Sequence, residues 1–225
     1  CRIILRIGGI MKNFLVIGMG RFGQHLSQKL AELGNDVMIV DKSEEAVNRL
    51  IDVVTCAQVA DCKNEEVLKS LSVNSFDMCI VCIGNDFQSS LEITSLLKDL
   101  GAKVVISKAS TKIQEKFLLR NGADAIVDPE KDLAHKLAVQ YSARNVFDYY
   151  RLSNDIAIYE TCVPKAWINK SLKEIDVRKI HEINVLATKK NGQVKIADVD
   201  YKFGPDDHIL ILGNANNIEK FTRGT

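Results

Sequence analysis

The run FLVIGMGRFG at 14–23 constrains the fold of this chain more than any other feature. Its first half predicts a buried strand, its GxGxxG pattern predicts a tight turn, and the residues beyond it read as a helix. A second apolar run, DVMIVD at 36–41, ends in an acid. We therefore predict a β-α-β unit in which Gly18 makes the turn, Gly20 lets a phosphate approach the backbone, and Gly23 lets the helix pack closely against the sheet.

Two polar residues of this unit indicate its ligand. Asp41 would accept hydrogen bonds from ribose hydroxyls, and its charge would repel a 2′-phosphate, so NADP is disfavoured. An alternative is that Asp41 only caps the helix that follows Ser43. Arg21 lies inside the glycine turn, where its guanidinium is placed to neutralise a charged phosphate chain. The turn therefore favours a polyphosphate.

Short apolar runs alternate with amphipathic stretches up to residue 142, which is typical of a parallel sheet flanked by helices. The expected strands are 14–18, 36–41, 53–57, 77–84, 103–108 and 125–127. The expected helices lie near 22–33, 43–51, 64–71, 87–100, 111–121 and 130–142. Ser43 and Asp61 read as caps before two of them. Such apolar strands need cover on both faces, so we expect an α/β, Rossmann-like doubly wound fold with ligands at the carboxyl ends of the strands.

The pattern changes after Tyr150. The expected strands are then 157–164, 183–190, 193–197 and 208–213, with a short helix near 171–174 and a closing helix at 214–222. Asn191-Gly192 predicts a two-residue hairpin turn. We therefore expect a nucleotide-binding domain at 12–142, a linker at 143–154 and a small α+β domain at 155–225.

The composition argues against several classes of protein. With 30 Lys+Arg against 29 Asp+Glu, the net charge of +1 gives no general attraction to nucleic acid or to a membrane surface. No apolar run approaches the roughly 20 residues that cross a bilayer. The six cysteines lie mostly in apolar runs, which suits a reducing cytoplasm, and the CxxC of Cys79 and Cys82 lacks the second ligand pair of a zinc site.

Residues 1–11 are expected to be a non-native or disordered extension, with natural translation starting at Met11. The segment CRIILRIGGI is too short for a signal peptide and has no small-residue cleavage site.

Catalytic groups are not evident. A dehydrogenase needs a general acid or base near the nicotinamide, and the second domain offers no convincing one. His181 lies at a helix–strand junction and His208 precedes an apolar strand, so we interpret both as structural. The chain is therefore expected not to be an enzyme.

The chain resembles the RCK (regulator of K⁺ conductance) subunits of bacterial potassium uptake systems, of the KtrA type with TrkA-N and TrkA-C domains, over residues 12–222. The motifs that carry the resemblance are FLVIGMGRFGQHL at 14–26, CIGNDFQSS at 82–90, ISKA at 106–109, NGADAIVDPEKD at 121–132 and ILILGNANNIEKF at 209–221. A generic dinucleotide-binding fold does not require the PEKD stretch. The resemblance implies a nucleotide-binding regulatory subunit that gates a potassium transporter.

The resemblance further implies that the first domain binds ATP or ADP, and also NAD(H). The residues it places at the nucleotide are Gly18, Gly20, Arg21, Phe22, Gly23, Asp41, Lys42, Asp61, Cys62, Ile83, Gly84, Asn85, Asp86, Lys108 and Glu130. Arg21 would meet the terminal phosphate, and Glu130 would approach it from the neighbouring subunit. Because a carboxylate beside a phosphate is unfavourable without a cation, we expect a bridging Mg²⁺, Ca²⁺ or Na⁺ at Glu130. The alternative is that Glu130, after Pro129, only favours the helix dipole.

The implied assembly is a homodimer that builds a homo-octameric ring beneath an integral-membrane KtrB/TrkH-like transporter subunit. The chain would then be cytoplasmic and peripheral to the inner face of the membrane, with no nucleic-acid partner. ATP and ADP would stabilise different ring shapes, since a ligand shifts a conformational equilibrium only through differential affinity.

The resemblance also implies that the C-terminal domain binds cyclic di-AMP through Arg178. Lys173 departs from the family, which usually has an aliphatic residue there. The alternative is that Arg178 is solvated and the domain only dimerises.

Two other functions stay open from the residues alone. GxGxxG with Asp41 also fits an NAD-dependent oxidoreductase, and it fits an NAD(H)-sensing regulator without a channel. A DNA-binding regulator would need a basic element, and none is evident.

Overall fold

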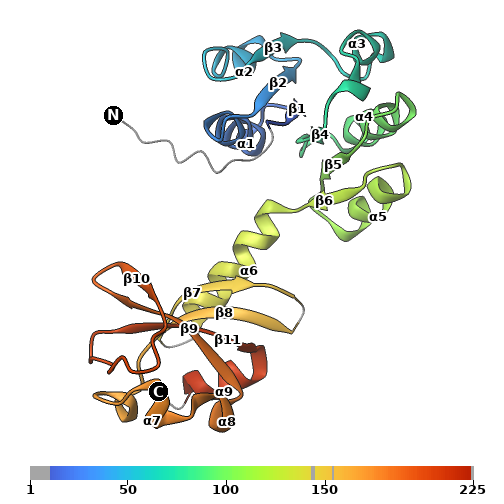
Figure 1. Ribbon diagram of the computed structural model, residues 1–225. Helices are drawn as coiled ribbons and strands as arrows, with labels where there is room; N and C mark the ends of the chain where they lie inside the picture. Colours follow the sequence, from blue (N-terminus) through green and yellow to red (C-terminus); the bar gives the residue numbers. More distant parts are fainter. Residues whose placement is uncertain (1–10, 143–144, 154, 224–225) are drawn as a thin grey trace. The chain divides into compact units, whose positions relative to one another are not determined.

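A computed structural model describes residues 11–142, 145–153 and 155–223 (Figure 1). The segment 1–10, expected to be part of an extension, lies outside the described residues. The chain divides into two compact units between Lys131 and Asp132, called unit 1 and unit 2 below. The sequence predicted this change of domain at 143–154.

Unit 1 is a parallel sheet with helices on both faces (Figure 1). Its strands are β1 (Asn13–Ile17), β2 (Asp36–Asp41), β3 (Cys56–Val59), β4 (Met78–Val81), β5 (Val105–Lys108) and β6 (Ala125–Val127). Its helices are α1 (Arg21–Glu32), α2 (Glu44–Asn48), α3 (Glu65–Ser70), the 3₁₀ turn η1 (Val73–Ser75), α4 (Phe87–Asp99) and α5 (Lys112–Arg120). The order β3-β2-β1-β4-β5-β6 with parallel pairing confirms the predicted Rossmann-like doubly wound fold.

Alternate residues of β1 face two different cores. Leu15 and Ile17 pack with the side of the sheet covered by α3 and α4, while Phe14 and Val16 pack with the side covered by α1 and α2. Burial on both faces explains the continuous apolar run of this strand. Because the chain crosses to opposite sides of β1, the order reverses between β1 and β4, and such a point opens a crevice at the carboxyl ends of the strands.

One strand of unit 1 was predicted in the wrong place. The strand expected at 53–57 is β3 at Cys56–Val59. Val53 and Val54 belong instead to the turn after α2, where both amides donate to the carbonyl of Leu50. The β-branched pair indicated a strand, but the turn geometry decided its conformation.

The two caps named from the sequence have different outcomes. Ser43 caps α2 as predicted, accepting a hydrogen bond from the Ala46 amide at 3.3 Å. The prediction for Asp61 was wrong, because Asn64 caps α3 and accepts from the Glu66 amide at 3.0 Å.

Unit 2 is an antiparallel sheet accompanied by short helices, which confirms the predicted α+β architecture. Its strands are β7 (Val146–Arg151), β8 (Ile156–Cys162), β9 (Ile183–Lys190), β10 (Gln193–Ile196) and β11 (His208–Asn214), in the order β10-β9-β11-β8-β7. The other elements are η2 (Lys165–Trp167), α7 (Leu172–Ile175), α8 (Val177–His181) and α9 (Ala215–Arg223). Helix α6 (Pro129–Ser142) runs from unit 1 into unit 2. Trp167, Ile209, Ile211 and Phe221 form part of the core between sheet and helices.

Strand β7, helix α8 and the 3₁₀ turn η2 of unit 2 were missed from the sequence, whereas the hairpin turn was predicted. The segment expected to be a linker contains β7, which pairs antiparallel with β8. Helix α8 was not predicted. The hairpin turn is confirmed, with φ of 50° at Asn191 and 78° at Gly192. None of the helices in the described ranges combines the length and the hydropathy that a membrane span requires.

Candidate functional site

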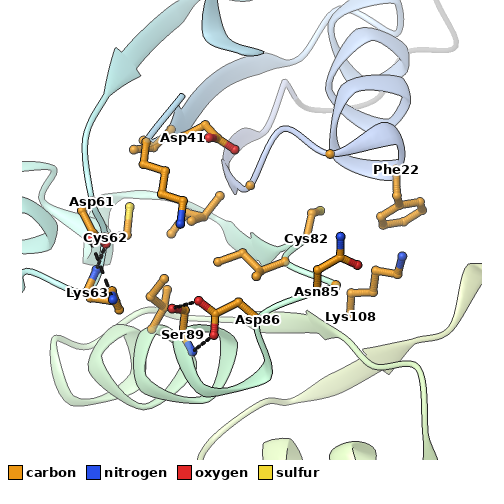
Figure 2. Close-up of a pocket in the computed structure, with 18 of the residues that line it drawn as sticks. Phe22, Asp41, Asp61, Cys62, Lys63, Cys82, Asn85, Asp86, Ser89 and Lys108 are labelled. Atoms are coloured by element: carbon orange, nitrogen blue, oxygen red, sulfur yellow. Dashed lines mark hydrogen bonds and ion pairs between the residues drawn. The ribbon is translucent and has the colours of Figure 1, made fainter. Parts of the chain in front are cut away.

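A pocket of about 540 Å³ opens at the carboxyl ends of β1, β2, β4 and β5, where the strand order reverses. Figure 2 shows the labelled side chains of the lining, with Asp41 above, Asp61, Cys62 and Lys63 on the left, Asp86 and Ser89 below, and Asn85, Lys108 and Phe22 on the right. Of the residues predicted to bind nucleotide, those that line the pocket are Gly18, Gly20, Arg21, Phe22, Asp41, Lys42, Asp61, Cys62, Ile83, Gly84, Asn85, Asp86, Lys108 and Glu130. Gly23 and Arg178 are not in its lining.

The three glycines of the turn have different physical requirements. Gly18 has φ of +96°, and a Cβ there would lie 2.9 Å from Cγ1 of Ile83. A Cβ at Gly23 would overlap the carbonyl oxygen of Gly18, so close helix–strand packing demands glycine. Gly20 has an ordinary φ of −66°, and no atom lies within 4 Å of a Cβ built there. The fold itself therefore does not require glycine at Gly20, and its missing side chain leaves room above the turn.

Helix α1 begins at this open turn without a cap. Its N-cap residue Gly20 offers no side-chain hydrogen bond, and its first turn holds no acid. By contrast, α2 to α5 are capped by the side chains of Ser43, Asn64, Asp86 and Thr111. The first amides of α1 and the positive end of its dipole thus lack a side-chain partner at the pocket, which is the arrangement that binds phosphate.

The Asp41 carboxylate holds the glycine turn against β2. Oδ2 accepts from the Met19 amide at 2.6 Å, and Oδ1 accepts from the Ser43 amide at 2.8 Å. Each carboxylate oxygen has a further lone pair, so Asp41 keeps acceptor capacity for a ribose hydroxyl. The alternative that Asp41 caps α2 is incomplete, because Ser43 supplies that cap.

Asp86 fixes the wall opposite Asp41. Its carboxylate caps α4 by accepting from the Ser89 hydroxyl at 2.6 Å and from the Ser89 amide at 3.0 Å. These bonds, the hydroxyl first, hold the pKa of Asp86 below its ordinary value, so it is ionised at neutral pH. Sequence reasoning missed Ser89 and Lys63 as lining residues, although the D-x-x-S spacing of a helix start signalled the first.

Lys108 and Glu130 meet at the pocket. The Lys108 ammonium lies 2.7 Å from Oε1 of Glu130, and the lysine side chain is only 11% exposed, whereas that of Glu130 is 68% exposed. The hydrogen bond from Lys108 lowers the pKa of Glu130. The resemblance implied that Glu130 approaches the nucleotide of a neighbouring subunit. In the structure of a single chain, Glu130 lines the pocket of that same chain.

The buried cysteines are unreactive at neutral pH. Burial raises the pKa of Cys62 and of Cys82 to about 12, the first assisted by the charges of Asp61 and Asp41, so both thiols stay protonated. Cys79 and Cys82 belong to cores on opposite faces of the sheet, so the CxxC cannot act as a pair. Within the described part of the chain, no group of three His, Cys, Asp or Glu is placed to hold a metal ion.

Unit 2 holds the remaining predicted site residue. Arg178 is exposed on α8, and Lys173 is exposed on α7. His181 packs its ring 5.2 Å from that of Phe221, which suits the structural role predicted for it. A second pocket of about 440 Å³ involves His181 but not Arg178.

Comparison with known proteins covers both units. Residues 14–129 match the model of the TrkA-N domain, and residues 161–223 match the model of the TrkA-C domain. The chain is 34% identical over 213 residues to the Ktr system potassium uptake protein C of Bacillus subtilis (strain 168), covering 94% of this chain and 96% of that protein. It is 34% identical over 211 residues to protein A of the same system and organism, covering 93% and 95%.

Solved structures with the same fold include the GsuK channel. Its TM-score is 0.71 at 13% identity, over 97% of this chain and 40% of that chain. The GsuK channel bound to NAD matches with a TM-score of 0.69, also at 13% identity, over 97% and 40% of the two chains. At this identity the likeness shows a common fold.

Proposed function

The chain belongs to the Ktr family of potassium uptake regulatory proteins with TrkA-N and TrkA-C domains, and we propose that it gates a membrane potassium transporter by binding adenine nucleotides. The role in potassium transport is supported by the family membership. The pocket of unit 1 supports the nucleotide part of the proposal.

The observation that carries nucleotide binding is the uncapped start of α1. Its amides open on the pocket beside Gly20, the one glycine of the turn whose side-chain position is free of protein atoms. Arg21 adds a cation in the same turn, and Asp41 faces the pocket with acceptor capacity for a ribose. A nucleoside polyphosphate satisfies all three features at once.

ATP is favoured over dinucleotides by Arg21, which lies in the glycine turn where a triphosphate would place its charge. The lining as a whole is balanced in charge, with the cations Arg21, Lys42, Lys63 and Lys108 and the carboxylates Asp41, Asp61, Asp86 and Glu130. NAD(H) remains a second ligand of the proposal, in line with the NAD-bound GsuK channel of the same fold. A bridging Mg²⁺, Ca²⁺ or Na⁺ would take most of its ligands from phosphate oxygens, because Glu130 supplies one carboxylate.

The proposed partner is an integral-membrane KtrB/TrkH-like subunit, with this chain as a non-enzymatic homo-octameric ring at the inner face of the membrane. ATP and ADP would favour different ring shapes, because Arg21 distinguishes them through the terminal phosphate.

Calorimetry with ATP, ADP, NADH and NAD⁺, followed by native mass and small-angle scattering of each complex, tests this proposal. We expect ATP to bind more tightly than NAD⁺ and the ATP and ADP complexes to scatter differently. Arg21→Gln should weaken the binding of ATP more than the binding of ADP. Identical assemblies and identical transport with both nucleotides would contradict gating.

Cyclic di-AMP is proposed as a second ligand, held by Arg178 in unit 2. Calorimetry on wild type and Arg178→Ala tests it, with Lys179→Ala as a matched control that removes the neighbouring charge of α8. Loss of heat in Arg178→Ala alone would support the proposal. Equal heats in all three proteins would remove it.

A further inference from the structure

We propose that Lys108 exchanges partners on ligand binding: it holds Glu130 at the start of α6, and a ligand phosphate that reaches Lys108 replaces Glu130 and releases it. This inference rests on the proposed function and adds a specificity-determining residue and a route from the pocket to α6.

Lys108 is confined at the pocket. It ends β5, its side chain is 11% exposed, and its ammonium lies against Gly84, where a Cβ would be 3.4 Å from Nζ. Figure 2 shows it beside Asn85 at the pocket edge. A lysine side chain with so little exposure is stabilised by an anionic partner.

Glu130 is the more replaceable half of the pair. Its side chain is 68% exposed, so on leaving Lys108 it passes into water with little desolvation to reverse. Lys108 cannot leave in the same way. An anion that enters from the pocket side therefore competes with Glu130 for the ammonium at 2.7 Å.

The exchange acts on α6 because Glu130 lies in its first turn. Asp128 accepts from the Lys131 amide at 3.0 Å and keeps the helix start in place, so release of Glu130 removes one tether without removing the cap. Helix α6 then continues into unit 2, where Lys136 pairs with Asp148 at 2.9 Å. Occupancy of the pocket is thus transmitted to the helix that connects the two units.

The Lys108–Glu130 pair makes the effect of a ligand depend on its charge. A nucleoside polyphosphate brings an anionic group that can replace Glu130, whereas adenosine brings none. Lys108 therefore selects for phosphorylated ligands, and only these release Glu130.

Calorimetry with ATP and adenosine on the full chain in EDTA tests the exchange. The variants are Glu130→Gln, Lys108→Gln, the double variant, and Asp132→Asn as a matched control that removes a carboxylate further along α6. We expect Glu130→Gln to tighten ATP binding about twofold to fivefold, because the competitor of the phosphate is gone. In the Lys108→Gln background, and for adenosine, Glu130→Gln should change nothing, and Asp132→Asn should leave ATP affinity unchanged.

Hydrogen exchange of α6 beyond its first turn, where the amides have intrahelical partners, gives a second readout. ATP should speed exchange there in wild type, while Glu130→Gln should exchange fast with or without ATP. Weaker ATP binding by Glu130→Gln, or equal tightening with and without Lys108, would overturn the exchange while leaving nucleotide binding intact. If the wild-type chain binds no nucleotide, the proposed function itself fails.

Discussion

The two units differ in whether particular polar groups have side-chain partners within the protein. In unit 2 the buried carboxylate of Glu160 has its partners inside the fold, with Lys189 Nζ and His208 Nδ1 each 2.8 Å from a carboxylate oxygen. In unit 1 the start of α1 carries no side-chain cap, and Gly20 leaves open space above it. The buried charge of Glu160 is therefore paired within unit 2, whereas the first amides of α1 in unit 1 have no side-chain cap.

Asp207 repeats the pattern of unit 2. Its Oδ2 accepts from the Tyr201 hydroxyl and from the Gly204 amide, each at 2.7 Å. Burial alone would raise the pKa of Asp207, but these bonds together with Lys190 hold the pKa below its ordinary value. Its Oδ1 is buried without a hydrogen bond and lies 3.7 Å from the Lys190 ammonium, so the charge of Asp207 depends on groups inside unit 2.

Gly23→Ala should have the largest effect and should be confined to unit 1. The new Cβ would overlap the Gly18 carbonyl oxygen, so helix and strand must separate at a cost of about 3 kcal/mol in the free energy of unfolding. Hydrogen exchange measured separately for the two units checks this. Unchanged protection of β1 and α1 would contradict the requirement for glycine at position 23.

Glu160→Gln should have the next largest effect, in unit 2. It removes the charge that Lys189 and His208 share, at a cost of about 2 kcal/mol. Trp167 is the single tryptophan of the chain and lies in the core of unit 2, so its fluorescence during urea unfolding reports this unit. A urea midpoint equal to that of wild type would show that the charge of Glu160 does not stabilise unit 2.

Much of unit 1 could be predicted, because its buried strands and glycine turn leave a strong pattern in the sequence. Strand β7 was missed because it lies at a sheet edge with only Val146 and Tyr149 buried, so no apolar run marks it. Helix α8 was missed because Asp176 and Glu182, both at positive φ, bound it where glycine would be the usual signal.

The part of the site that could be predicted consists of residues at the carboxyl ends of the strands. The pocket lining at β1, β2 and β4 comes from residues that directly follow apolar runs. The Lys108–Glu130 pair within one chain was not foreseen, since it depends on the register of β5 and β6, in which Lys108 lies opposite Val127. Register between distant strands is set by packing and cannot be read from residue order.

Acidification should have the smallest effect and should act on unit 2 through its paired carboxylates. Burial by itself would raise the pKa of Glu160, but His208 and Lys189 lower it, and the pKa of Asp207 is lowered as well. The folded state therefore gains stability above the ordinary carboxylate range and loses it as the pH falls below about 5. The urea midpoint followed by Trp167 fluorescence should fall between pH 6 and pH 4, and less steeply in Asp207→Asn. Equal slopes would contradict this assignment.

Calorimetry with ATP on wild type and Gly20→Ser, combined with thermal unfolding, tests whether the open start of α1 binds the nucleotide. Serine fits the φ of −66°, its Cβ has open space beyond the neighbouring residues, and as an N-cap it should keep or raise the stability of α1. Its side chain would occupy the space above the turn and supply the missing cap. We predict an unchanged or higher melting temperature together with loss of ATP binding. Full ATP affinity in Gly20→Ser would contradict the claim that the open start of α1 is the nucleotide site.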